Sequence, residues 1–249
     1  MRNSIILIAG LIFLTLNGTA QSQDKEKNQF PLLGDKAPKF TGESTMGTIN
    51  FPADYVNKWK ILFSHPADFT PVCTSEIIAL ASMQGDFEKL NTQIIVISTD
   101  GLESHFEWCR SMESLNLDGY PAVKINFPLV SDVSLSISRK YGMIHRSSST
   151  AKDIRAVFII TPDNKVAAIF YYPSNIGRNL EEIKRTLIAL QTSEKHTVLT
   201  PVNWQKGQDV LLLAPTSVAE SKKLEKQANS DPDARIYKRA WYMWFKKLE

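Results

Sequence analysis

The stretch HPADFTPVC, residues 65–73, places a cysteine where a strand ends and a helix begins. The apolar run at 61–63 predicts a buried strand, and residues 74–90 predict an amphipathic helix with apolar side chains near one face. Thr70 suits the N-cap of that helix, and the proline after it suits the first helical position. Cys73 then lies in the first turn, where unpaired backbone N–H groups and the positive end of the helix dipole stabilise a thiolate, the reactive form of cysteine.

The segments around this stretch predict an alternation of strands and helices. Strands are predicted over 60–64, 93–98, 127–130, 156–160 and 166–172, and helices over 74–90, 101–114, 131–143 and 179–191. The residues Thr-Pro-Asp-Asn at 161–164 indicate a hairpin between the last two strands. This order is that of a thioredoxin-like α/β domain, which we expect over residues 31–195. The pattern weakens beyond it, so residues 196–249 are predicted to form a separate C-terminal module.

Composition limits the classes of function. The chain has 249 residues, of which 43% are hydrophobic, and that suits one large domain with an appendage. Its formal net charge of +3 is too small to indicate nucleic acid as a partner. Two cysteines do not make a disulfide scaffold; in an oxidising compartment they are redox-active or form a single structural pair.

The N-terminus has the pattern of a secretory signal peptide. Arg2 is followed by an apolar run at 5–16, about 12 residues long, which is too short for an ordinary membrane span. Small residues at 18–20 occupy the expected cleavage positions. We therefore expect residues 1–20 to be removed, a mature chain that starts near Gln21, and export to the periplasm or the exterior. The alternative is an uncleaved membrane anchor; otherwise no membrane contact is expected.

The residues around the cysteine distinguish two kinds of redox site. A thioredoxin-type site would carry C-x-x-C, whereas residues 70–73 read Thr-Pro-Val-Cys. Threonine can form hydrogen bonds but no disulfide, so the site keeps the nucleophile and loses dithiol exchange. The spacing of Pro66, Thr70 and Cys73 resembles the peroxidatic motif of peroxiredoxins, and HPADFTPVCT resembles the one-cysteine branch of that AhpC/TSA-type, thiol-specific antioxidant family.

Further segments resemble the same family and follow in its order. They are GDKAPKF at 34–40, RAVFII at 155–160, YYP through GRN at 171–179, and TPVNW with KG at 200–207. Together these segments span about residues 30–210. The resemblance implies a thioredoxin-like fold with a C-terminal peroxiredoxin extension.

The resemblance also implies an activity. The chain would be a thiol-dependent peroxidase that reduces hydrogen peroxide and organic hydroperoxides in antioxidant defence. Cys73 would displace oxygen from the O–O bond and become a sulfenic acid. The electrons would come from an external thiol, and no metal, haem or flavin is implied. Two rival readings are a thioredoxin-like thiol–disulfide exchange enzyme and a chaperone-type binding protein.

The other site residues are assigned from the same resemblance. Thr70 would hydrogen-bond the peroxide and the sulfur, and Pro66 would shape the pocket and shield the sulfur from water. Arg155 would place a planar, permanently charged donor against both the thiolate and the peroxide. Arg178 would orient that guanidinium or lower the pKa of the sulfur, unless it is only a residue at a helix start. His65 would lie near the sulfur or be a structural histidine.

Cys109 has two open interpretations. It lies in the predicted helix 101–114, in a segment that resembles the position of the resolving cysteine in atypical two-cysteine thiol peroxidases. As a candidate resolving residue it would form a disulfide with Cys73, and both helices would have to unwind locally for the sulfurs to meet. Alternatively it is a buried structural cysteine next to Trp108.

The end of the chain carries aromatic residues among basic ones. The aromatics lie at near-helical spacing, at Tyr237, Trp241, Trp244 and Phe245. A basic aromatic helix could bind a membrane surface, or its aromatic stripe could pack on a partner subunit or on the chain's own core. We favour packing on a second subunit, in a homodimer or a higher homo-oligomer, because the family's tail commonly reaches a second subunit.

Overall fold

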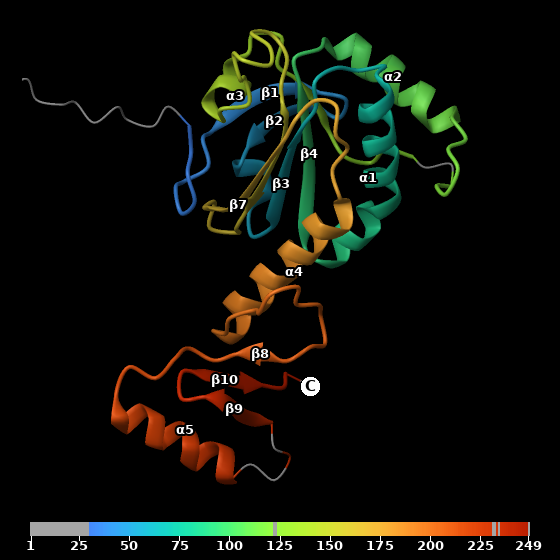
Figure 1. Cartoon of the computed structure of the whole chain (residues 1–249). Helices are drawn as coiled ribbons and strands as arrows, with labels where there is room; N and C mark the ends of the chain where they lie inside the picture. Colours follow the sequence, from blue (N-terminus) through green and yellow to red (C-terminus); the bar gives the residue numbers. More distant parts are fainter. Residues whose placement is uncertain (1–29, 122–123, 231–232, 234, 249) are drawn as a thin grey trace, which may run out of the picture.

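The computed structural model describes residues 30–121, 124–230, 233 and 235–248. The predicted signal peptide at 1–20 lies outside the described residues. Figure 1 shows a large α/β lobe and a smaller C-terminal lobe, joined through helix α4 (Leu180–His196). In the described part of the chain, no helix combines the length and apolar character needed to cross a membrane.

A seven-stranded mixed sheet forms the centre of the large lobe. Its strands lie in the order β2 (Gly47–Phe51), β1 (Phe40–Ser44), β5 (Leu129–Ser131), β4 (Thr92–Ser98), β3 (Trp59–Ser64), β6 (Arg155–Ile160) and β7 (Val166–Tyr172). The pairs β3–β4 and β4–β5 are parallel, and the other neighbours are antiparallel. This arrangement confirms the predicted thioredoxin-like α/β fold.

Both faces of the sheet are covered, which explains the continuous apolar runs of its central strands. All six residues of β3 are buried, and alternate side chains point to opposite faces. Ile61 and Phe63 pack in the core beneath α1 (Pro71–Lys89), α2 (Leu102–Ser114) and α4, whereas Leu62 packs in the core on the other face. That second core includes Ile137 of α3 (Ser136–Lys140), while a short 3₁₀ helix, Ala53–Tyr55, follows β2.

The helix predicted over 131–143 is wrong in extent. Residues 129–131 form β5, and only the five residues of α3 are helical. Leu135 adopts a left-handed conformation with φ of 60°, and the Asp132 carboxylate accepts hydrogen bonds from the backbone N–H and the hydroxyl of Ser138, each at 2.7 Å. This side-chain-stabilised turn competes with the helix and delays its start.

Helix α4 is longer than the predicted 179–191. Its start follows the sequence signal, because the Asn179 side chain accepts the backbone N–H of Glu182 at 3.1 Å. Its end lies at His196, after which Thr197 turns the chain with φ of 52°. The extra turns carry the chain from the large lobe to the C-terminal lobe (Figure 1).

The C-terminal lobe corrects the helical reading of the tail aromatics. It contains β8 (Val210–Leu211), α5 (Val218–Ser230), β9 (Ile236–Ala240) and β10 (Met243–Lys246), with the strands in the order β8-β10-β9. Tyr237 and Phe245 face each other across β9 and β10, with ring centroids 5.2 Å apart, and Trp244 is buried. A spacing that fits one helix face also fits two strands joined by a tight turn at Trp241 and Tyr242.

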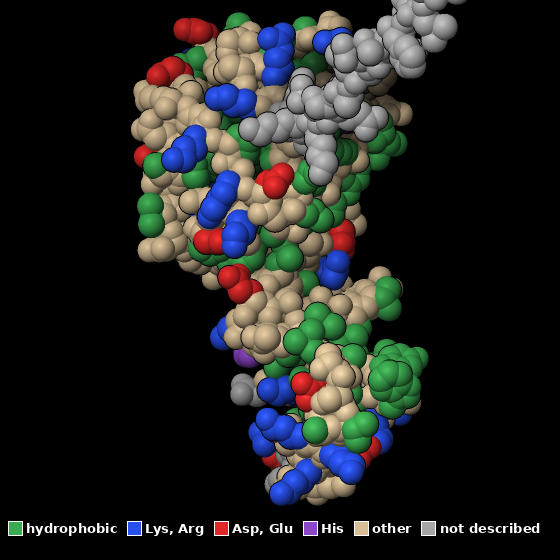
Figure 2. All heavy atoms as spheres, turned by 90° about the vertical axis from the view of Figure 1, so that its left-hand side faces the viewer, with side chains coloured by type: hydrophobic (Ala, Val, Ile, Leu, Met, Phe, Trp, Pro, Cys, Tyr) green, Lys and Arg blue, Asp and Glu red, His purple; other side chains and the backbone are tan. Residues whose placement is uncertain are grey.

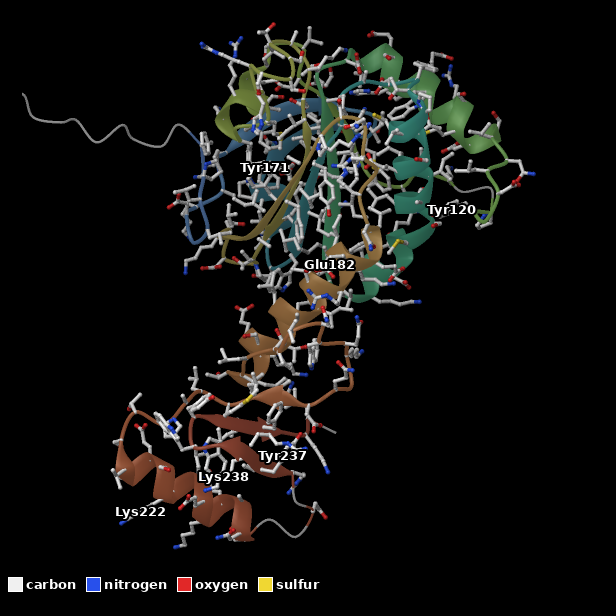
Figure 3. The ribbon with its side chains drawn as sticks, in the orientation of Figure 1. Tyr120, Tyr171, Glu182, Lys222, Tyr237 and Lys238 are labelled. Atoms are coloured by element: carbon white, nitrogen blue, oxygen red, sulfur yellow. The ribbon has the colours of Figure 1, made fainter. Side chains whose placement is uncertain are left out.

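Contacts hold this lobe together and attach it to α4. Lys238 on β9 forms an ion pair with Glu225 on α5. Figure 3 labels Lys238, and α5 can be found there by the label of Lys222. Trp204 and Val210 pack with Ala189 of α4 in a small third core. The domain boundaries predicted from the sequence, 31–195 for the α/β domain and 196–249 for the C-terminal module, stay predictions.

Candidate active site

The candidate nucleophile lies at the junction that the sequence predicts. Strand β3 ends at Ser64, a loop covers residues 65–70, and α1 begins at Pro71, so that Cys73 is the third helical residue. Its side chain is 0% exposed. The first backbone N–H groups of an α-helix have no partner within the helix, so they point into this site.

Thr70 occupies the N-cap position without capping the helix through its side chain. Its backbone is extended, and its hydroxyl donates instead to the carbonyl of Ala67 at 2.9 Å. The hydroxyl proton is therefore engaged, while the oxygen keeps lone pairs that can accept a hydrogen bond. Pro66, in the same loop, is half-buried.

Arg155 contacts the sulfur directly. It is the first residue of β6, and its Nη1 lies 3.2 Å from Cys73 Sγ and 2.7 Å from Glu76 Oε2. Its Nε and Nη2 donate to the carbonyl of Ser174 at 2.9 and 2.7 Å. Among the described residues these bonds engage four of its five N–H groups, so one N–H on Nη2 is available to a ligand.

Glu76 is the centre of this arrangement, and sequence reasoning missed it. It lies three residues after Cys73, on the same face of α1, and is buried. Arg178 donates to it from Nη2 at 2.7 Å, from Nε at 2.9 Å and from its backbone N–H at 2.8 Å. Burial opposes ionisation of Glu76, but the hydrogen bonds and charge of Arg178, with the charge of Arg155, outweigh it and lower the pKa of this carboxyl.

Arg178 connects to the candidate nucleophile, Cys73, through Glu76 and Arg155. Its Nη1 donates to the carbonyls of Ser64 and Ala156, at 2.7 and 2.9 Å, and its guanidinium carbon lies 3.3 Å from the centroid of the Phe63 ring. We call Glu76, Arg155 and Arg178 the arginine–glutamate cluster. Two guanidinium groups and one carboxylate leave one net positive charge beside the Cys73 sulfur, and this charge interacts more strongly with a thiolate than with a thiol.

His65 is buried, and among the described residues its ring forms one hydrogen bond, which goes to Asp68 and not to the sulfur. Its Nε2 lies 2.9 Å from Asp68 Oδ1, and the other oxygen of Asp68 lies 2.7 Å from His105 Nδ1. Burial lowers the pKa of His65, an effect that Asp68 partly offsets. We call His65, Asp68 and His105 the histidine–aspartate cluster. Asp68 and His105 were not among the predicted site residues.

Cys109 is a half-buried free thiol on α2. It packs against the same core as Cys73, and its neighbour Trp108 donates from Nε1 to the hydroxyl of Thr74 on α1 at 3.2 Å. Burial raises the pKa of Cys109 to about 12, and the negative charges of Glu113 and Asp68 act in the same direction. This thiol is therefore almost entirely protonated at neutral pH.

One group of side chains has the donor atoms of a metal site. His65, Asp68 and Asp100 offer ligand atoms within 4.8 Å of one another. Lys152 forms an ion pair with Asp100 at 2.9 Å, and the backbone N–H of Asp68 donates to the same carboxylate at 2.7 Å. The carboxylate oxygens of Asp68 and Asp100 are thus already engaged in hydrogen bonds and an ion pair within the protein.

Two family models match the chain. The AhpC/TSA family matches residues 33–169, and the C-terminal domain of 1-Cys peroxiredoxin matches residues 189–227. A peroxiredoxin of Methanosarcina mazei is 44% identical over 218 residues, which cover 87% of this chain and 98% of that protein. A peroxiredoxin of Aquifex aeolicus is 36% identical over 228 residues, covering 88% of this chain and 97% of the relative.

Solved structures of other proteins are similar to this chain over most of its length. A structure of yeast mitochondrial 1-Cys peroxiredoxin, concerned with a thiol resolving mechanism via glutathione/thioredoxin systems, has a TM-score of 0.74 at 33% identity. It covers 87% of this chain and 99% of its own. A mutant of the peroxiredoxin 6 of Arenicola marina also has a TM-score of 0.74, at 32% identity, and covers 88% of this chain and 98% of its own.

Proposed function

Because the chain belongs to the AhpC/TSA family of peroxiredoxins, which are thiol-dependent peroxidases, we propose that Cys73 reduces hydrogen peroxide and organic hydroperoxides. The thiolate attacks the terminal oxygen of ROOH and the O–O bond breaks, which gives the Cys73 sulfenic acid and RO⁻. RO⁻ then takes up one proton, equal to the one released when the Cys73 thiol ionised, and leaves as ROH. The observation that carries this proposal is the hydrogen bond from Arg155 Nη1 to Cys73 Sγ at 3.2 Å.

The same residues can stabilise the charge that moves along the O–O bond. Thr70 can accept the peroxide O–H, since its own proton is held by the carbonyl of Ala67. The remaining N–H of Arg155 and the free N–H groups of the first turn can donate to the oxygen on which negative charge develops. Fixed donors of this kind supply the main stabilisation in many reactions with an oxyanion.

Access to the sulfur favours a slender reacting group. Cys73 is fully buried, so a hydroperoxide would have to approach it with its narrow O–O end first. Pro66 and Phe69 lie in the loop that precedes the helix, and Phe69 is exposed in a left-handed conformation with φ of 53°. We assign to Pro66 the role of shielding the sulfur from water.

An external thiol would complete the cycle. It attacks the Cys73 sulfenic acid, releases water and forms a mixed disulfide, which a second thiol reduces. The high pKa of Cys109 favours this route over an internal disulfide, because attack requires a thiolate. The yeast relative is described with glutathione/thioredoxin systems, which supports a low-molecular-weight or protein thiol here.

One equivalent of hydrogen peroxide tests the proposal. We expect the reduced protein to gain one oxygen atom, and a dimedone-type reagent to label Cys73, as read by mass spectrometry of peptides. Cys109→Ser should be labelled to the same extent. A Cys73–Cys109 disulfide as the main product would contradict the external route, and an unmodified Cys73 would contradict the proposed nucleophile.

A homodimer accounts for apolar surface that the single chain leaves open. In the C-terminal lobe Trp241 is 69% exposed and Val218 is 72% exposed, and α5 has no buried side chain among its described residues. Figure 2 shows apolar side chains and Lys and Arg gathered on this lobe, which projects from the large one. We propose that a second copy covers part of this surface. Sedimentation should give twice the chain mass; a monomer at micromolar concentration would contradict this.

We also propose export of the chain, on the strength of the signal-like residues 1–20. Cells that make the full chain should release or store a form beginning near Gln21. The intact mass of that form measures the cleavage, and a full-length mass in a membrane fraction would instead indicate an anchor.

A further inference from the structure

The histidine–aspartate cluster contains one carboxylate between two buried imidazoles. Asp68 Oδ1 lies 2.9 Å from His65 Nε2, and Asp68 Oδ2 lies 2.7 Å from His105 Nδ1. Both histidine side chains are completely buried, and that of Asp68 is nearly so. Burial disfavours the charged carboxylate, but the hydrogen bonds from His105 and His65 outweigh it and hold the pKa of Asp68 below its usual range.

The second nitrogen of His105 determines how many hydrogens this ring carries. His105 Nε2 lies 3.3 Å from the carbonyl oxygen of Val130 on β5, and a carbonyl can only accept. His105 therefore faces an acceptor at each ring nitrogen, and both contacts are hydrogen bonds only if both nitrogens carry a hydrogen. The ionised Asp68 supplies the matching negative charge, so this arrangement favours an imidazolium at His105.

The other histidine has the opposite arrangement. His65 Nε2 must carry the hydrogen that it shares with Asp68, and its Nδ1 has no hydrogen-bond partner among the described residues. A buried N–H without an acceptor is costly, so Nδ1 keeps its lone pair and His65 is neutral. The charges of His105 and Arg178 also oppose a second cation there. The cluster thus combines one cation, one anion and one neutral ring.

This cluster fixes the loop that leads to the nucleophile. Asp68 lies in that loop, two residues before Thr70, and its backbone N–H donates to the carboxylate of Asp100, two residues after the end of β4. The His65 ring lies 4.9 Å from that of Trp108, which bonds to Thr74 on α1. Two side chains of helix α2 therefore hold the loop: His105 contacts Asp68, and Trp108 packs beside His65.

We propose that His105, as a buried imidazolium, is a positioning residue of the peroxidase site. It holds Asp68, and through Asp68 the loop that places Thr70 beside Cys73. The inference rests on the proposed function. A neutral His105 would direct a lone pair at Asp68 or at the Val130 carbonyl and would loosen the loop. The other groups that face the cluster are Asp100, paired with Lys152, and the protonated thiol of Cys109 one turn along α2.

Nitrogen NMR of the intact chain labelled at histidine tests the protonation state directly. The chain has four histidines, and spectra of His105→Asn, His145→Asn and His196→Asn assign three signals and leave the fourth to His65. At pH 7 we expect His105 to carry hydrogens on both nitrogens and His65 to carry one on Nε2. A neutral His105 at pH 7 would overturn the inference, whatever the peroxidase assay shows.

Kinetics test the positioning role. His105→Asn keeps a donor toward Asp68 but no charge, and we expect its rate constant with hydrogen peroxide to fall about tenfold to a hundredfold. The exposed His196→Asn should match the wild type. As the pH changes, the wild-type rate should follow the protonation of His105 that NMR measures, and the rate of His105→Asn should lack that dependence.

The outcomes separate this inference from the proposed function. If wild type does not oxidise Cys73 with peroxide, the proposed function fails while the NMR result stands. A folded His105→Asn with the wild-type rate overturns the positioning role alone. Should the variant not fold, the test is whether the wild-type rate changes with pH together with the protonation of His105 measured by NMR, and a rate that does not follow it counts against the role.

Discussion

Replacing Cys73 with serine should abolish peroxide reduction, with a loss of more than about 10³-fold in the rate constant. A serine hydroxyl is not ionised at neutral pH, and it cannot form the stable oxidised product that a sulfenic acid provides. The variant keeps an oxygen acceptor for Arg155, so the fold should be intact by circular dichroism. Peroxide consumption with a generic dithiol as electron donor measures the effect.

Cys109→Ser is the matched control for this experiment. It removes the other cysteine from the same core, and with the generic thiol it should retain the wild-type rate. A loss of turnover in Cys109→Ser, with normal first oxidation of Cys73, would instead make Cys109 the resolving residue. Insulin reduction by the wild type would support a thioredoxin-type exchange activity, which the T-x-x-C sequence disfavours.

Local patterns in the sequence were sufficient to predict most of the fold and the position of the candidate nucleophile at a strand–helix junction. The strand and helix around Cys73 follow from an apolar run, a proline and an amphipathic repeat, all within about 30 residues. Arg155 and Arg178 were identified only through resemblance, since an arginine at a strand or helix end usually lies on the surface. The structure places both of them within the arginine–glutamate cluster.

The groups that sequence reasoning missed depend on contacts that are distant in the chain. Glu76 resembles any glutamate of an exposed helix face, but its partners Arg155 and Arg178 are 79 and 102 residues away. Asp68 and His105 are separated by 37 residues. The signal that could have found Glu76 is its place three residues after Cys73, on the helix face that carries the buried residues.

The tail shows the limit of spacing as evidence. Four aromatic residues at near-helical intervals equally suit a hairpin. The two residues of the turn change the sequence spacing between side chains that lie on the same face of the two strands. The choice depends on β8, which pairs with β10 and gives the hairpin a third strand. A pair of strands is marginal by itself, so this contact from outside the segment decides its structure.

Glu76→Gln should destabilise the protein by about 3–5 kcal/mol and slow the reaction with peroxide. The substitution keeps the shape but removes the only carboxylate of the arginine–glutamate cluster, so two buried guanidinium groups face each other without compensation. One amide oxygen cannot accept all the hydrogen bonds that Glu76 accepts. The new NH₂ group also directs its N–H groups toward the N–H groups of the two arginines. Urea unfolding measures the free energy change.

Glu88→Gln supplies the control on the same helix. Its side chain is exposed, so its free energy of unfolding should stay within about 0.5 kcal/mol of the wild type. The slower reaction of Glu76→Gln has a separate cause, because Arg155 loses one of the two acceptors that hold Nη1 beside the sulfur. If Glu76→Gln were as stable and as fast as Glu88→Gln, the buried carboxylate would have no part in holding Arg155, and the charge balance inferred for this site would be wrong.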